Sequence, residues 1–102
     1  MNKNQKEKRN FRASKIWKAF RKKMMNKQKG IDPITKHKLY KGWNLHHRHV
    51  TADTDEYQDI SNEEHYVCFN KQTHEFLHWL YRYWKKDPEI LERLEIELES
   101  WY

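Results

Sequence analysis

The sequence has 102 residues, 36% of them hydrophobic and 15% aromatic, so it has room for one small domain whose core depends on a few large side chains. The aromatic content excludes a disordered chain, and the one cysteine, Cys68, excludes an internal disulfide and a zinc site made of several cysteines. No apolar run approaches the roughly 20 residues of a membrane span, and the lysine-rich start lacks the apolar stretch of a signal peptide. We therefore expect a soluble, cytoplasmic protein.

The formal net charge of +6 is distributed unevenly. Residues 1–30 carry twelve Lys or Arg and one acid, Glu7, which gives this segment a charge of +11. The other 72 residues carry nine basic and fourteen acidic side chains, a charge of −5. A basic arm on an acidic body is typical of proteins that contact a polyanion, most simply nucleic acid, and equally of a solvated terminus. Charge alone does not decide between the two.

The first half of the chain predicts a helix followed by a hairpin. Residues 1–9 are polar and charged, and we expect a flexible basic tail before a single domain over 10–102. Apolar residues then recur at three- and four-residue steps as far as residue 28, the spacing of a helix. The apolar stripe consists of Ala13, Trp17, Phe20 and Met24, and another face carries Lys15, Lys18 and Lys22. Gly30 ends this helix and Asp32-Pro33 starts a turn. Thr35 to Val50 is expected to form a β-hairpin with Gly42 near its bend.

The second half predicts a loop, a strand and two helices. Residues 51–64 are acidic and polar, which favours a long loop, and Tyr66 to Phe69 is a short candidate strand. A helix is expected from Thr73, and its apolar residues occur on nearly all sides, which predicts burial between other elements. After Asp87-Pro88, a last helix from Glu89 has one apolar face, and its outer side carries Glu92, Glu95, Glu97 and Glu99. The expected fold class is α+β, in one small domain.

Four histidines form the most informative pattern. His74 and His78 are separated by four residues, so they lie on one face of the predicted helix, where two imidazoles can bind a single ion. His46 and His47 are adjacent in a predicted strand, so their side chains point in opposite directions. If His46 turns towards the helix, it can act as a third ligand while His47 stays available as a general base. An isolated H-x-x-x-H, or a strand with two histidines, is also common on surfaces without function.

The same residues resemble a known family. LHHRHV at 45–50, Asn62, and HEFLH at 74–78 match in order the motif of HNH nucleases, also called His-Me finger or ββα-metal nucleases. The paired histidines and the H-x-x-x-H are most similar to the DNase colicins, and the flanking segments to small HNH endonucleases of phages and bacteria. The similarity covers about residues 30–84, and it implies a ββα-metal core over about 35–84, hairpin plus metal-binding helix.

The resemblance implies a role for each matched residue. His46, His74 and His78 would be metal ligands, His47 the general base that activates water, and Asn62 the residue that fixes the loop behind the base. The implied function is a metal-dependent endonuclease that hydrolyses DNA phosphodiester bonds in a bacterial or phage-infected cell. The ion would be Zn²⁺, Ni²⁺, Mn²⁺ or Mg²⁺, and three imidazoles favour the first three over Mg²⁺.

Two departures from the family pattern matter. Many members have Asp in place of His46. Many also have a four-cysteine zinc knuckle that stabilises the fold, which Cys68 alone cannot provide, so packing by Trp43, Trp79 and Trp84 is expected to replace it.

Other side chains are weaker candidates for function. Arg48 and Arg82 could hold the scissile phosphate or form surface ion pairs, and Lys15, Lys18 and Lys22 could hold the DNA backbone. His37, His49 and His65 are expected to have no role in the site, although His49 could instead contact a phosphate. A carboxylate site is less favoured than a solvated loop for Asp53, Asp55 and Asp59. Cys68 is expected to fill the core.

Two alternatives to a nuclease stay open. One is a non-catalytic DNA-binding module with a closed zinc site, for which Cys68 or His49 would supply the fourth ligand. The other is an HNH-like fold that serves as a phage accessory or inhibitor protein and binds a bacterial or phage protein through the acidic last helix. A homodimer would suit cleavage of both DNA strands.

Overall fold

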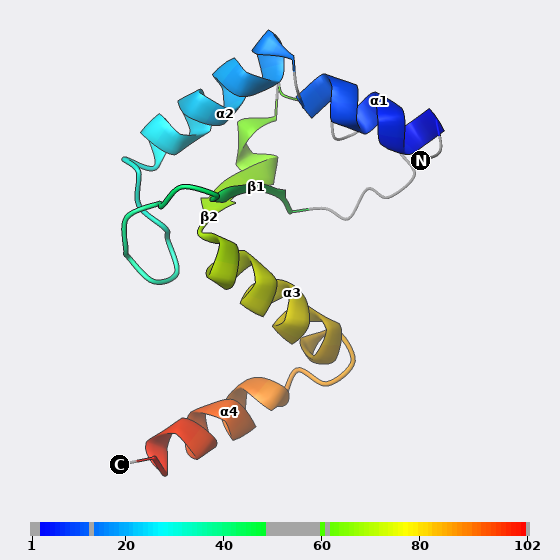
Figure 1. Cartoon of the computed structure of the whole chain (residues 1–102). Coiled ribbons are helices and arrows are strands. Elements are labelled where there is room, and N and C mark those ends of the chain that lie inside the picture. Colours follow the sequence, from blue (N-terminus) through cyan, green and yellow to red (C-terminus); the bar gives the residue numbers. More distant parts are fainter. Residues whose placement is uncertain (1–2, 13, 49–59, 61, 102) are drawn as a thin grey trace.

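The computed structural model describes residues 3–12, 14–48, 60 and 62–101. It contains four α-helices and two strands within these residues (Figure 1). The helices are α1 (Lys3–Arg12), α2 (Lys15–Lys27), α3 (Lys71–Trp84) and α4 (Ile90–Glu99), and the strands are β1 (Asn44–His47) and β2 (Tyr66–Phe69). A short 3-10 helix, Glu63–His65, precedes β2. The expected α+β class is confirmed. None of the described helices has the length and apolar character to cross a membrane.

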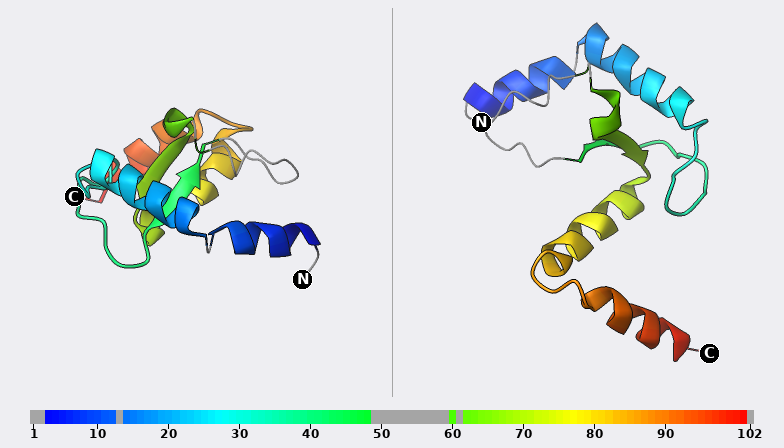
Figure 2. Two further views of the ribbon diagram at one scale, coloured as in Figure 1. Left: turned by 90° about the horizontal axis from the view of Figure 1, so that it is seen from above. Right: turned by 180° about the vertical axis from the view of Figure 1, so that it is seen from behind.

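The N-terminal segment forms two helices. The residues expected to be a tail lie largely in α1, which Figure 2 shows projecting away from the sheet. Ser14 separates α1 from α2, because its backbone is extended and its hydroxyl accepts a hydrogen bond from the Trp17 amide at 3.2 Å. This is an N-cap, which satisfies one of the amides that a helix start leaves without an intrahelical partner. The helix expected from residue 10 therefore starts at Lys15.

The sheet pairs β1 with β2, and the hairpin expected from Thr35 to Val50 was wrong. β1 is antiparallel to β2, with His46 opposite Val67 and His47 opposite Tyr66. Of the described residues between α2 and β1, only Ile31 and Lys38 make a β-bridge. The segment turns instead of extending, with positive φ angles at Lys36 and Gly42. The strand expected at Tyr66–Phe69 is confirmed.

The two faces of the sheet have different neighbours. Tyr66 and Cys68 pack against Phe20 and Met24 of α2, and these four side chains form the buried core. Because side chains alternate along a strand, Val67 and Phe69 lie on the opposite face, which α3 contacts. Figure 1 shows α2 on one side of the sheet and α3 leaving from the other. Cys68 is fully buried, as expected of a core residue.

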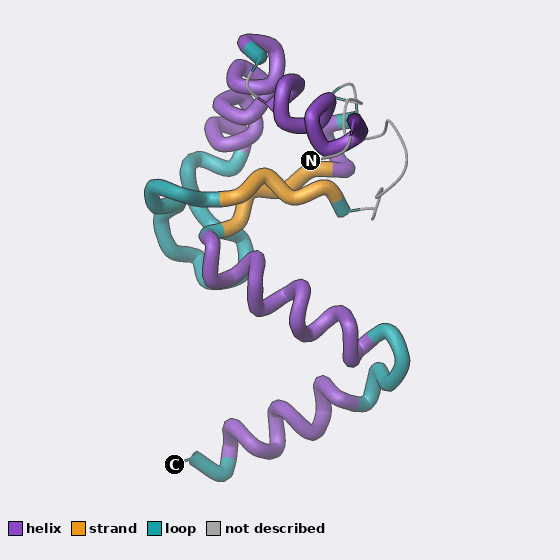
Figure 3. The backbone as a smooth tube through the Cα atoms, turned by 45° about the vertical axis from the view of Figure 1, so that its right-hand side comes forward, coloured by secondary structure: helices purple, strands orange, loops and turns teal. Residues whose placement is uncertain are grey.

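Helices α3 and α4 extend away from this core. Figure 3 shows them as two arms of an open V, joined by the turn after Trp84. The radius of gyration is 16.0 Å, whereas a compact chain of this length would have one of about 12.8 Å. The expectation that α3 is buried between other elements was wrong, because large side chains remain exposed along it: Phe76, Trp79, Tyr81, Tyr83 and Trp84. Among the described residues, α3 contacts α4 and the two strands, and these elements leave the five side chains exposed.

Three polar side chains hold the segment before β1 in place. The Gln28 amide pairs with the backbone of Cys68, donating to its carbonyl at 3.0 Å and accepting from its amide at 2.6 Å. Asp32 is fully buried and accepts hydrogen bonds from the amides of Ile34, Thr35 and Asn70. The Asn70 side chain in turn bonds the backbone of residues 38 and 40.

These contacts replace the tryptophan packing expected to stabilise the fold. Trp43 does pack against the core, but Trp79 and Trp84 are each 41% exposed. Hydrogen bonds from the buried Asp32 and the partly buried Gln28 and Asn70 supply the support, because β2 pairs with β1 alone among the described residues and its other backbone groups need partners.

Candidate metal centre

Three imidazoles from two elements meet between the sheet and α3. The Nδ1 atom of His46 lies 3.1 Å from Nε2 of His74, and Nε2 of His78 lies 3.0 Å from the same His74 atom. One ring nitrogen of each residue lies within 4.8 Å of the other two. The expected convergence of these three histidines is confirmed, and they lie close enough to hold one metal ion.

The local structure explains why the three rings meet. His74 and His78 lie one turn apart near the start of α3, so they share a face. His46 pairs with Val67 and therefore points to the sheet face that α3 contacts. Its ring lies 6.1 Å from that of Phe69, just before the chain turns into α3. α3 begins directly after β2, because Asn70 is its N-cap residue and the His74 amide donates the first helical hydrogen bond to the Asn70 carbonyl at 2.9 Å.

The donor set fits a divalent cation. In a tetrahedral zinc site with Zn–N bonds of about 2.0–2.1 Å, two ligand nitrogens lie ~3.3 Å apart. The two separations at His74 are close to this value. The Nε2 atom of His74 has one lone pair or one hydrogen, so it cannot complete hydrogen bonds with both neighbours at once. A cation accepts a lone pair from each ring and removes that conflict.

The environment of His46 and His74 disfavours their protonated forms. Burial, the largest cause, together with the nearby positive charge of His74, His78, His47 and Arg48, lowers the pKa of His46 to about 4. Burial also lowers the pKa of His74, an effect that His78 reinforces and Glu75 partly opposes. Because metal binding needs neutral imidazole, ligands that resist protonation are ready to bind at neutral pH.

An apolar groove adjoins the three histidines. A cavity of about 320 Å³ runs from their rings along α3 to α4. Besides His46, His74, His78 and Arg48, its walls consist of Phe69, Leu77, Leu80, Tyr81, Trp84 and Leu91. Apolar walls beside a cation exclude water and strengthen its electrostatic interactions. The apolar periodicity of the sequence predicted the helix α3. It could not show which side of α3 lines a groove, because that depends on where α4 packs.

His47 lies on the other face of β1. Its ring is 4.8 Å from the ring of Tyr66 and 5.8 Å from that of His65. Tyr66 belongs to the α2 side of the sheet, so β1 separates the imidazoles of His46 and His47 as strand geometry predicts. Because β1 ends at His47, the two rings are both close to the end of the strand.

A chain of backbone hydrogen bonds connects Asn62 to this strand end. The Asn62 carbonyl accepts from the His65 amide at 3.0 Å, and the His65 carbonyl accepts from the Arg48 amide at 2.8 Å. The Arg48 guanidinium donates to the Glu64 carbonyl. Asn62 thus helps to hold the backbone beside His47 in place.

The structure separates the other basic candidates from the three histidines. Lys15, Lys18 and Lys22 are exposed on α2, which covers the opposite face of the sheet. Arg82 is exposed on α3 but lines a different hollow, with Lys86, Asp87 and Arg93 near the start of α4. His49 and three acidic candidates, Asp53, Asp55 and Asp59, lie outside the described residues.

Comparisons with family models, curated proteins and solved structures found no match to this chain.

Proposed function

We propose that the protein is a metal-dependent HNH endonuclease that hydrolyses DNA phosphodiester bonds. The observation that carries the proposal is the meeting of His46, His74 and His78, with His47 next in the chain and on the other face of the strand. β1, β2 and α3 would form the ββα-metal finger of that family. Two antiparallel strands followed at once by a helix with two inward histidines support this assignment.

His46, His74 and His78 would hold the ion. Among the described residues, no other side chain joins these three histidines as a candidate ligand. An ion bound by three ligands would have further coordination positions open to substrate. Sites with three protein ligands and an open position are the catalytic type. When bound, a divalent ion supplies positive charge that stabilises the phosphate and the departing oxygen in the transition state.

The neighbouring side chains have separate tasks in this mechanism. His47 removes a proton from the attacking water, a role open to it because its imidazole is not a ligand. Asn62, through the backbone of His65, keeps the strand end in position. Arg48 lines the groove beside His46 and would hold the scissile phosphate by a charge-assisted hydrogen bond.

The test is a plasmid-nicking assay with added Zn²⁺, Ni²⁺, Mn²⁺ or Mg²⁺, with and without chelator. His47→Ala should lower cleavage by at least about 100-fold, the usual contribution of a general base, and leave metal binding unchanged. His74→Ala should lose both. His37→Ala is the matched control for metal binding, because His37 is exposed and its described hydrogen bonds use only its backbone. Equal metal loss in the His47 and His74 variants would contradict the assigned roles, and absence of nicking with every ion would refute the activity.

A closed structural zinc site is less well supported. Cys68, one of the two candidates for a fourth ligand, is buried on the α2 side of the sheet, away from His46, and the other candidate, His49, lies outside the described residues. A protein-binding role has one observation in its favour, the large apolar side chains exposed on α3, on α4 and after the end of α4, where Trp101 is 73% exposed. Co-purification with a stable partner, together with no cleavage under any ion, would favour an accessory or inhibitor protein.

A further inference from the structure

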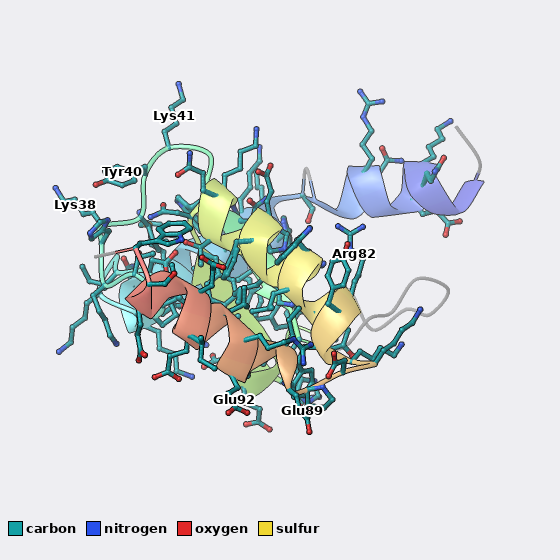
Figure 4. All side chains as sticks on the ribbon, turned by 90° about the horizontal axis from the view of Figure 1, so that it is seen from below. Lys38, Tyr40, Lys41, Arg82, Glu89 and Glu92 are labelled. Atoms are coloured by element: carbon teal, nitrogen blue, oxygen red, sulfur yellow. The ribbon has the colours of Figure 1, made fainter. Side chains whose placement is uncertain are left out.

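The segment over residues 36–41, here called the basic loop, has a composition suited to nucleic acid. Its sequence is KHKLYK, with three lysines and no acidic residue. All of its side chains are exposed except Leu39, and Tyr40 is 60% exposed. Figure 4 shows Lys38, Tyr40 and Lys41 projecting outward from one end of the molecule.

The basic loop is attached to the helix that carries two of the three metal-competent histidines. The Asn70 side chain accepts a hydrogen bond from the Tyr40 amide at 2.7 Å and donates to the Lys38 carbonyl at 2.8 Å. Asn70 is the N-cap residue of α3. His74 lies four residues further on, about 6 Å along the helix axis. The start of α3 therefore fixes the position of the basic loop and also the position of His74 and His78.

The backbone of the basic loop is well held. The His37 carbonyl accepts from the Asp32 amide at 2.8 Å, and the Lys36 amide donates to the Asp32 carbonyl at 2.9 Å. Leu39 donates its amide to Gly30 and packs against the core. A loop fixed in this way loses little backbone freedom when it binds, so its charges favour association at low entropic cost.

We propose that the basic loop binds the phosphate backbone of the DNA strand that enters the metal centre. This inference rests on the proposed function and deepens it by identifying the substrate-binding surface. The lysines would contact phosphates, and Tyr40 offers a ring on which an unpaired base can stack. Lysines 15, 18 and 22 of α2 serve this purpose less well, because they lie on the far side of the sheet from the three histidines.

The experiment measures binding of a fluorescent 20-base-pair duplex in EDTA, where no metal-dependent cleavage occurs, over a range of salt concentrations. The test variant is Lys38→Gln with Lys41→Gln. The matched control is Lys85→Gln with Lys86→Gln, two exposed lysines at the other end of α3. Loss of two phosphate contacts should reduce the slope of log affinity against log salt by about 1.8, and weaken binding at 0.1 M salt by roughly 10- to 60-fold.

The control pair should bind like the unchanged protein. Equal losses in both pairs, unchanged affinity in the test pair, or absence of DNA binding would each overturn the inference. So would a test pair that keeps its DNA affinity and loses self-association, because the loop would then belong to a protein interface.

The inference and the proposed function can fail separately. A protein that nicks DNA but binds it equally well without the two lysines refutes the role of the loop alone. A protein that binds DNA through the loop and never nicks it refutes the nuclease alone.

Discussion

If His46, His74 and His78 bind a divalent ion, as proposed, the ion should raise the melting temperature of this protein, and His74→Ala should abolish most of the rise. His74 is the decisive position, because its Nε2 atom is 3.1 Å from the His46 ligand atom and 3.0 Å from that of His78. The rings need little rearrangement to bind. An ion at 100 times its dissociation constant should therefore stabilise the folded state by about 2.7 kcal/mol, provided that the unfolded chain does not bind it.

This free energy converts into a temperature shift through the entropy of unfolding. For 102 residues at about 2.1 cal/mol/K each, that entropy is about 0.21 kcal/mol/K, so the expected rise is about 13 °C. The measurement is thermal unfolding followed by circular dichroism, with Zn²⁺ or Ni²⁺ and with EDTA. His37→Ala should keep the full rise. A rise below about 2 °C in the unchanged protein, or one of equal size in His74→Ala, would refute the assignment of these ligands.

Three further results are expected. In EDTA, the free energy of unfolding should be steady above pH 6.5 and fall between pH 6.5 and 4. In this range the unfolded chain binds a proton at His46, whereas the folded chain, in which the pKa of His46 is about 4, does not. Denaturant midpoints that do not fall over this range would contradict this. Burial raises the pKa of the Cys68 thiol to about 11, although Arg21 partly opposes this, so a disulfide reagent at pH 8 should label the folded protein on the order of 100-fold more slowly than the unfolded one. Asp32→Asn should cost about 3 kcal/mol in chemical denaturation, because an amide cannot accept from all three backbone donors; a cost under 1 kcal/mol would show that the carboxylate is dispensable.

The short-range patterns of the sequence predicted the site well. The four-residue spacing of His74 and His78 and the alternation of His46 and His47 follow from helix and strand geometry, and both are confirmed. The strand at Tyr66–Phe69 was also predicted with its correct bounds, because a run of four apolar residues between polar ones is typical of a short buried strand. These features depend on neighbours in the chain and need no knowledge of the fold.

Long-range pairing was harder to predict. Residues 35 to 50 contain alternating apolar positions and a glycine, so a local hairpin was the simplest interpretation, yet β1 pairs with a strand about twenty residues later. The competing factor was Asp32, whose carboxylate draws the backbone of Ile34 and Thr35 into a turn. A buried carboxylate looks like any solvated Asp in the sequence alone.

The exposure of α3 was also beyond the sequence. A helix with apolar residues on most sides is usually buried. Here α4 contacts α3, and Phe76, Trp79 and Tyr83 nevertheless remain exposed. The number of apolar positions on a helix indicates how much surface can be covered, and the covering element must be found in three dimensions.

The position of the three nitrogens has a consequence for the mechanics of the chain. His46 and His74 are 28 residues apart, so an ion held by both would act as a reversible cross-link. A disulfide that closes a loop of this length restricts the unfolded chain by about 3.6 kcal/mol. The ion would thus fasten the strand to the helix in the manner of a covalent staple, one that dissociates when metal is scarce. Supply of the cation would then regulate the integrity of the protein as well as its chemistry.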